Sequence, residues 1–266
     1  MGFSDVPHTY WPLVAVVIGI VSGVSSGAFG IGGGVVNKPL LRVFLRAAPG
    51  LVIGSPIPAQ FFGATLGSIS YFKKRMINFR LVWLATPFAI AGTILGAWLT
   101  SFLNLDYLMG FLVLVVLWTG SRMIGKSFRI KAHEPEECTA AGMYKVAPTA
   151  FVAGTVAGLL GVGGGFLLVP AFNMVLKREI KECIASSLMI VALTAIPNGI
   201  IHWALGHIDW NLASSLLVGQ MIGVWFGTIF TIKSHRKLVY FLFGLFLIIV
   251  SLTQARLEIL NTLGGS

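Results

Sequence analysis

The stretch SGAFGIGGGVVNKPLL, residues 26–41, interrupts an apolar sequence with five glycines in eight positions and then a lysine. The three adjacent glycines, Gly32 to Gly34, are poor helix formers, and glycine accepts positive φ at little cost. Pro39 suits the first turn of a following helix, where its missing N–H costs little. The stretch therefore predicts two helices joined by a tight glycine turn.

The same pattern occurs a second time. GAFGIGGGVVNKP begins at Gly27, and GLLGVGGGFLLVP begins at Gly158, which is 131 positions later. The offset continues without a gap beyond the motif, as the pairs Ser55 and Ser186, Leu81 and Leu212, and Gly92 and Gly223 illustrate. The chain therefore contains two copies of one unit. We predict a first repeat over 1–125, a polar linker over 126–145 and a second repeat over 146–266.

Long uncharged runs place the chain in a membrane. The sequence is 56% hydrophobic and 11% charged, whereas soluble domains carry about 25% charged residues. Because a bilayer-spanning helix needs roughly 20 apolar residues and the runs do not alternate as barrel strands do, we predict an all-α integral membrane protein. The expected apolar segments are 12–30, 35–46, 53–72, 81–103 and 107–122 in the first repeat, and 146–160, 166–177, 184–206, 210–232 and 238–255 in the second.

The basic residues orient these segments. If the linker is cytoplasmic and each repeat crosses the membrane an odd number of times, fifteen of the nineteen Lys and Arg residues lie on the cytoplasmic side. This agrees with the positive-inside rule. An odd number of crossings also makes the repeats opposite in orientation, which is a common transporter architecture with the substrate site near the midplane. We expect the protein in the cytoplasmic membrane of a bacterium or archaeon.

The segment after each glycine turn is short. Val35 to Arg46 would span roughly 18 Å at about 1.5 Å per residue, which is less than the hydrocarbon core of about 30 Å. We therefore expect segments one and two of each repeat to form a hairpin that turns near the midplane. Entering from opposite faces, the two hairpins would bring their glycine turns together.

Backbone N–H groups at such turns and at a helix start favour an anion. Charges at membrane depth are costly and usually functional, which singles out Lys38. The candidate substrate-binding residues are Gly32, Gly33, Gly34, Asn37, Lys38, Ser55, Gln60, Gly163, Gly164, Gly165, Ser186, Ser187, Asn198 and His202. Nearer the surface, Arg42 and Arg46 are expected to attract anions to an entrance.

Structural alternatives exist for most of these residues. Glycines at small-xxx-small spacing allow close helix packing, which is the interpretation preferred for Gly92, Gly96, Gly223 and Gly227. Lys38 could snorkel to the interface. The serines could bond a neighbouring helix, and His202 could be an interfacial residue with an ordinary hydrogen bond.

Other function classes find little support. GSRMIGKS, residues 120–127, matches a phosphate-binding loop, but it ends a membrane segment, so no nucleotide is expected. The basic loops are explained by topology rather than by nucleic acid. Cys138 and Cys183 suggest neither a disulfide framework nor a metal site. The apolar runs contain no acid, base or metal cluster, so we expect no cofactor and no enzyme activity.

Two G-x-G-G-G turns, each followed by an apolar stretch and a proline, resemble the sulfite exporter TauE/SafE family over about Pro12 to Thr253. The resemblance implies a transporter of small sulfur-containing anions, such as sulfite or an organosulfonate like sulfoacetate. Export by alternating access is the expected mechanism, with protons as a candidate coupling ion. An anion channel, or an accessory membrane subunit of a system that metabolises sulfur compounds, remains an alternative.

Overall fold

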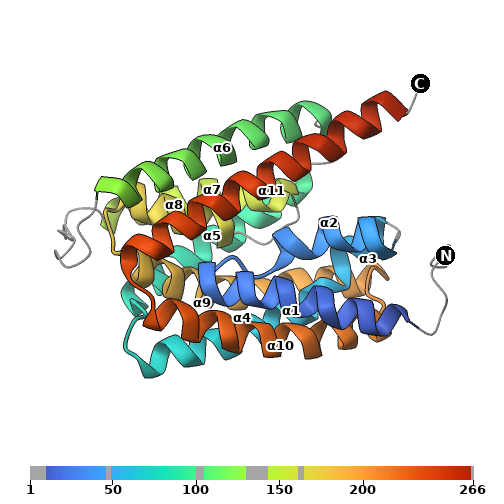
Figure 1. Ribbon diagram of the computed structural model, residues 1–266, viewed down its shortest axis with the longest axis horizontal. Helices are drawn as coiled ribbons and strands as arrows, with labels where there is room; N and C mark the ends of the chain where they lie inside the picture. The colour runs from blue at the N-terminus through green and yellow to red at the C-terminus, as the bar shows by residue number, and fades with distance from the viewer. Residues whose placement is uncertain (1–9, 46–48, 100–104, 130–142, 161–164, 265–266) are drawn as a thin grey trace. The chain divides into compact units, whose positions relative to one another are not determined.

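The computed structural model describes residues 10–45, 49–99, 105–129, 143–160 and 165–264, and all regular structure within them is helical. The α-helices are α1 (Trp11–Phe29), α2 (Gly34–Leu45), α3 (Pro49–Gly54), α4 (Pro56–Lys73), α5 (Phe79–Leu99), α6 (Leu105–Arg129), α7 (Val146–Leu160), α8 (Gly165–Val175), α9 (Ile180–Ala204), α10 (Trp210–Lys233) and α11 (Arg236–Gly264). A short 3₁₀ helix, η1 (Met143–Lys145), precedes α7. Figure 1 shows these elements in chain order from blue to red.

Within the described ranges, five helices are long and apolar enough to cross a membrane: α1, residues 79–96 of α5, α9, α10 and residues 236–253 of α11. The shorter apolar helices include α7 and α8. The expectation of an all-α, multi-pass membrane protein is therefore confirmed. In the first hairpin, α1 is long enough to cross, whereas α2 has only 12 residues. The depth of the turn and the opposite orientation of the repeats stay predictions.

The expected third segment, 53–72, is divided in the structure. It forms α3 and α4, which meet at Ser55. Pro56 lies just after this position and provides the first residue of α4. Proline suits this place, because its missing N–H costs little at a helix start.

The chain divides into two compact units. The larger comprises residues 1–97 and 137–233, and the smaller comprises residues 98–136 and 234–266. This division follows contacts rather than the order of the chain, so helices from both sequence repeats contribute to each unit. The assignment of two repeats and a cytoplasmic linker remains a prediction.

In the larger unit, α1 packs closely along α10, as Figure 1 shows for the blue and orange helices. A Cβ atom added to Gly23 would lie 2.5 Å from the carbonyl oxygen of Gln220. The same contact occurs between α7 and α5, where a Cβ atom on Gly154 would lie 2.5 Å from the carbonyl oxygen of Ala89. Both residues of the second pair are related to the first by the repeat offset, so this offset reappears in helix packing.

The glycines assigned to packing behave accordingly. Gly223 and Gly227 face the backbone of α1, and Gly92 faces the backbone of α7. Small residues let membrane helices approach to backbone contact, where dispersion forces replace the hydrophobic effect that lipid removes. The described contacts therefore confirm this interpretation for these three glycines.

The smaller unit contains α6 and α11, which lie side by side. Gly120 faces Gly244, and the Ser127 hydroxyl donates to the carbonyl oxygen of Lys237 at 2.8 Å. The contacts move toward the C-terminus of α6, from Gly120 to Ser127, as they move toward the N-terminus of α11, from Gly244 to Lys237. The two helices are therefore antiparallel. The stretch 120–127 lies within α6 and is helical. A phosphate-binding loop has a different, non-helical backbone, so this stretch does not form one.

Candidate functional site

The first glycine turn forms as its sequence predicts, but the expectation for Pro39 is wrong, because it lies inside α2 and not in its first turn. Helix α1 ends at Gly30, whose φ is 71° and whose N–H donates to the carbonyl oxygen of Ser26 at 2.8 Å. Gly32 and Gly33 follow with φ of 78° and 82°. Residues with a Cβ atom rarely adopt these values. The N–H of Asn37 then donates to the carbonyl oxygen of Gly33 at 3.0 Å, which starts α2.

The turn is enclosed by other elements of the larger unit. A Cβ atom on Gly30 would lie 2.6 Å from Ser187 Oγ on α9. A Cβ atom on Gly165, the first residue of α8, would lie 2.8 Å from Ile31 Cα and would also meet the carbonyl oxygen of Gly30. The first turn therefore meets the C-terminal end of the second glycine motif. The other predicted glycines of that motif, Gly163 and Gly164, lie outside the described residues.

Three buried amide side chains surround the turn. Gln220 Nε2 on α10 donates to the carbonyl oxygen of Gly32 at 3.2 Å, and Asn37 Nδ2 donates to Gln220 Oε1 at 3.4 Å. The amide nitrogen of Gln60 on α4 lies 2.6 Å from the place where a Gly32 Cβ atom would be. Asn37 and Gln220 are fully buried, and Gln60 is nearly so.

One acceptor in this group is unsatisfied. Asn37 Oδ1 is buried and has no hydrogen-bond partner among the described residues. Its orientation is fixed, because Gln220 must direct its NH₂ group to Gly32 and its oxygen to Asn37. Leaving a buried acceptor unpaired costs about 1–3 kcal/mol. Such a group in a native fold calls for an explanation, and a ligand or water that donates a hydrogen bond would supply one.

A group of basic residues lies near the start of α2 and the end of α9. Lys38 is half-buried and lies within electrostatic range of His202 and Arg42. His202 Nδ1 and His207 Nδ1 are 3.1 Å apart, so the N–H of one ring donates a hydrogen bond to the nitrogen of the other. His207 in turn packs against Gly50 and Gly54 on α3. Of these residues, Lys38 and Arg42 supply the positive charge that can attract an anion.

The predicted serines have partners in neighbouring elements. Ser55 Oγ accepts from the Asp209 N–H at 3.0 Å, and Ser186 Oγ accepts from the Asn78 N–H at 3.1 Å. The Ser187 hydroxyl donates to the carbonyl oxygen of Gly30 at 3.0 Å. These contacts match the alternative in which the serines bond neighbouring elements, and an additional role in anion binding stays a prediction.

The remaining predicted residues are spread along the helices. Gly34 is buried at the start of α2, and Asn198 is half-buried on α9. Arg42 is exposed on α2, whereas Arg46 lies outside the described residues. The structure thus brings Gly32, Asn37 and Gln60 together at one turn. It places Asn198 and Arg42 on other parts of the helices.

The sequence prediction missed Gln220 and His207. Gln220 is a fully buried amide in an uncharged segment, and that polarity was a usable signal. Its counterpart in the first repeat is Ala89, so a comparison of the two repeats does not mark it. His207 lies in the loop before α10 and is equivalent to Met76 in the first repeat. Its contact with His202 is one that no sequence pattern indicates.

Comparison with known proteins identifies the family of the chain. The family described as sulfite exporter TauE/SafE matches residues 15–253. The chain is 24% identical to the probable membrane transporter protein YunE of Bacillus subtilis (strain 168), over 90% of this chain and 95% of that protein. It is 26% identical to a probable membrane transporter protein of Xylella fastidiosa (strain 9a5c), over 90% of this chain and 93% of that protein.

A further relative is the probable membrane transporter protein YdhB of Bacillus subtilis (strain 168), which is 21% identical over 82% of this chain and 90% of its own length. No solved structure matches the chain significantly. These names describe transporters rather than enzymes, in agreement with the expectation from the sequence. The chain belongs to the sulfite exporter TauE/SafE family of membrane proteins.

Proposed function

We propose that the protein exports a small sulfur-containing oxyanion, such as sulfite or an organosulfonate like sulfoacetate, across the cytoplasmic membrane. The observation that carries this proposal is the enclosed glycine turn with its three buried amides. Polar groups inside a membrane protein are expensive and typically mark a substrate pathway. Non-helical backbone is tolerated at membrane depth where it is buried in protein, as residues 30–34 of this turn are.

Charge favours an anion over a cation. None of the nine acidic residues lies in α1, α2, α7 or α8, the helices that precede and follow the two turns, and α9, which packs on the first turn, carries Glu182 in its own first turn. Lys38 follows Asn37 directly on α2, and the Arg42 guanidinium lies within electrostatic range of it and adds to the positive potential there. A cation would meet no counter-charge from α1, α2, α7 or α8, whereas an anion would gain Lys38 and amide N–H donors.

The repeated packing supports alternating access. The contact of α1 with α10 matches that of α7 with α5, with both partners shifted by the repeat offset. Two equivalent helix pairs of this kind can exchange conformations around a fixed site, as in other repeat transporters. Because the apolar runs contain no carboxylate, proton coupling would reside in the anion itself.

The experiment is flux in proteoliposomes that contain only this protein. The panel is sulfite, thiosulfate, sulfoacetate, sulfate and chloride, with wild type, Lys38→Ala and the exposed control Lys73→Ala. We expect saturable, countertransport-active flux of one sulfur anion, reduced in Lys38→Ala and unchanged in Lys73→Ala. Flux that does not saturate would indicate a channel instead.

The other outcomes are equally informative. Flux that survives Lys38→Ala would contradict the role of the lysine and leave the turn and its amides as the site. Absence of flux for every anion would contradict the proposal and favour an accessory membrane subunit.

A further inference from the structure

A cavity of about 530 Å³ opens at one end of the larger unit, between the loop that joins α4 to α5 and the loop that joins α8 to α9. Its charged lining consists of three cations, Arg75, Arg178 and Lys181, and two carboxylates, Glu179 and Glu182. The volume lies within the range of about 300–1,000 Å³ that is usual for small-molecule sites. The excess of cations makes the cavity suited to a small anion.

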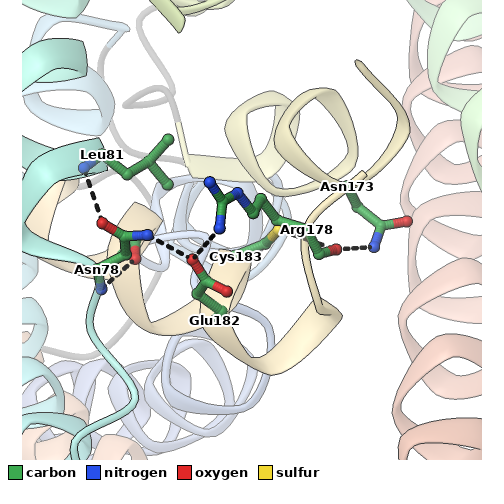
Figure 2. A network of polar contacts seen from close by, with 7 residues as sticks. Asn78, Leu81, Asn173, Arg178, Glu182 and Cys183 are labelled. Carbon is green, nitrogen blue, oxygen red and sulfur yellow. Dashed lines mark hydrogen bonds and ion pairs between the residues drawn. The ribbon is translucent and has the colours of Figure 1, made fainter. Parts of the chain in front are cut away.

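The polar contacts in Figure 2 fix the wall of this cavity. Glu182 Oε1 accepts from Asn78 Nδ2 at 2.7 Å and lies 3.7 Å from an Arg178 guanidinium nitrogen. Asn78 is itself held by its N–H donation to Ser186 Oγ at 3.1 Å. Glu182 Oε1 therefore accepts one hydrogen bond from Asn78, and its 3.7 Å separation from Arg178 is that of an ion pair without a hydrogen bond. The guanidinium keeps donors for another partner.

None of the three cations has a charged counterpart at the repeat offset. At the repeat offset, Arg75 corresponds to Gly206, and Lys181 corresponds to Gly50. Arg178 corresponds to Ala47. If the cations were a by-product of the repeated architecture, the other repeat would carry them as well. The three cations are therefore specific to the repeat positions that line this cavity.

We propose that this cavity is a vestibule that binds the transported oxyanion before it reaches the glycine turns. The inference rests on the proposed function, because it assigns a loading site to the same substrate. In the proposed orientation this end is cytoplasmic, which is where an exporter takes up its substrate. A cavity larger than a small oxyanion admits it with part of its hydration shell, so binding is weak and exchange is fast. Converging positive charge raises the local anion concentration.

The positive-inside rule provides the competing explanation, since it places cations on this side whether or not they bind a ligand. Lys73 and Lys74 supply the control. They belong to the same loop region and are exposed, but they do not line the cavity. If only the general surface potential mattered, removing the charges of these two lysines would weaken sulfite uptake as much as removing those of Arg75 and Arg178.

The test measures initial rates of labelled sulfite uptake into inside-out membrane vesicles, where the cytoplasmic end faces the bath. We expect the double variant Arg75→Gln and Arg178→Gln to raise KM about three- to tenfold with little change in maximal rate, and the shift to shrink in high salt. The control double variant Lys73→Gln and Lys74→Gln is expected to retain the wild-type KM.

A gain of affinity separates this effect from damage to the fold. Glu182→Gln keeps an oxygen that can accept from Asn78 Nδ2, but it removes one negative charge from the lining, so KM is expected to fall. An equal KM in the double arginine variant and wild type, or an equal rise in the lysine control, would overturn the vestibule while leaving transport in place. Absence of wild-type sulfite flux would overturn the proposed substrate and this inference with it.

Discussion

Ser55 Oγ accepts a hydrogen bond from the Asp209 N–H at 3.0 Å, and the same bond recurs at the repeat offset, where Ser186 Oγ accepts from the Asn78 N–H at 3.1 Å. In each case a serine of one repeat holds the loop before a helix of the other repeat. The side chains of Asp209 and Asn78 also accept from the N–H three residues on, in Leu212 and Leu81. The two repeats therefore exchange equivalent contacts.

This exchange predicts matched losses of stability. Ser55→Ala and Ser186→Ala each leave one backbone N–H without its partner, so each is expected to lower stability by about 1 kcal/mol. Thermal unfolding of the protein in detergent measures the change. Exposed Ser214→Ala serves as the control and should have little effect. Unchanged stability in both variants would show that water replaces the serines and that the exchanged bonds are not structural.

The glycine turn predicts a contrast between two positions with nearly the same backbone conformation. Gly30 and Gly206 have φ of 71° and 70°, but a Cβ atom on Gly30 would collide with Ile184 and Ser187, whereas one on Gly206 would meet nothing within 4 Å. Gly206→Ala should therefore cost only backbone strain, about 1–2 kcal/mol. Gly30→Ala should prevent close packing of the turn against α9 and abolish flux.

Size-exclusion profiles and flux of the two variants check this contrast. If Gly30→Ala folds and transports like wild type, the tight contact between the turn and α9 is not required for function. Equal damage from both substitutions would instead assign the whole effect to backbone conformation.

The sequence was sufficient for the fold class and the turn, because both depend on local features. Charge-free runs of the right length and adjacent glycines act through hydrophobicity and φ preference at the residues themselves. The cluster of buried amides could be predicted from the sequence only in part. Asn37 and Gln60 attracted attention as polar residues in apolar segments, but the partner that organises them, Gln220, comes from a helix 183 positions later in the chain than Asn37. Such contacts depend on tertiary packing, which no local pattern encodes.

The proposed anion site predicts the effect of a negative charge beside the turn. Asn37→Asp is nearly isosteric and keeps the residue next to Lys38, but it places a carboxylate where Asn37 Oδ1 already lacks a donor among the described residues. We expect sulfite flux to fall at least about tenfold, because like charges in a poorly hydrated site repel strongly. The matched control is Asn211→Asp, which adds the same charge at an exposed position near the start of α10. An equal or higher sulfite flux in Asn37→Asp, measured at equal protein content in proteoliposomes, would contradict an anion site beside Asn37.

The buried serines of α1 and α9 predict opposite responses to the same substitution. Within the part of the chain that the structure describes, Ser26 Oγ is buried without a hydrogen-bond partner, whereas the Ser187 hydroxyl bonds the carbonyl oxygens of Gly30 and Ile184. Removing a buried hydroxyl that has no partner relieves a desolvation cost. Removing one that donates a hydrogen bond leaves its carbonyl acceptor buried without a donor. Ser26→Ala is therefore expected to hold or raise the midpoint of thermal unfolding, and Ser187→Ala to lower stability by about 1 kcal/mol.

Flux separates a structural role from a functional one at Ser26. A more stable Ser26→Ala protein with normal flux identifies an idle hydroxyl, whereas a stable protein with impaired flux would mean that the hydroxyl serves transport, most directly by bonding a ligand or water that passes the turn.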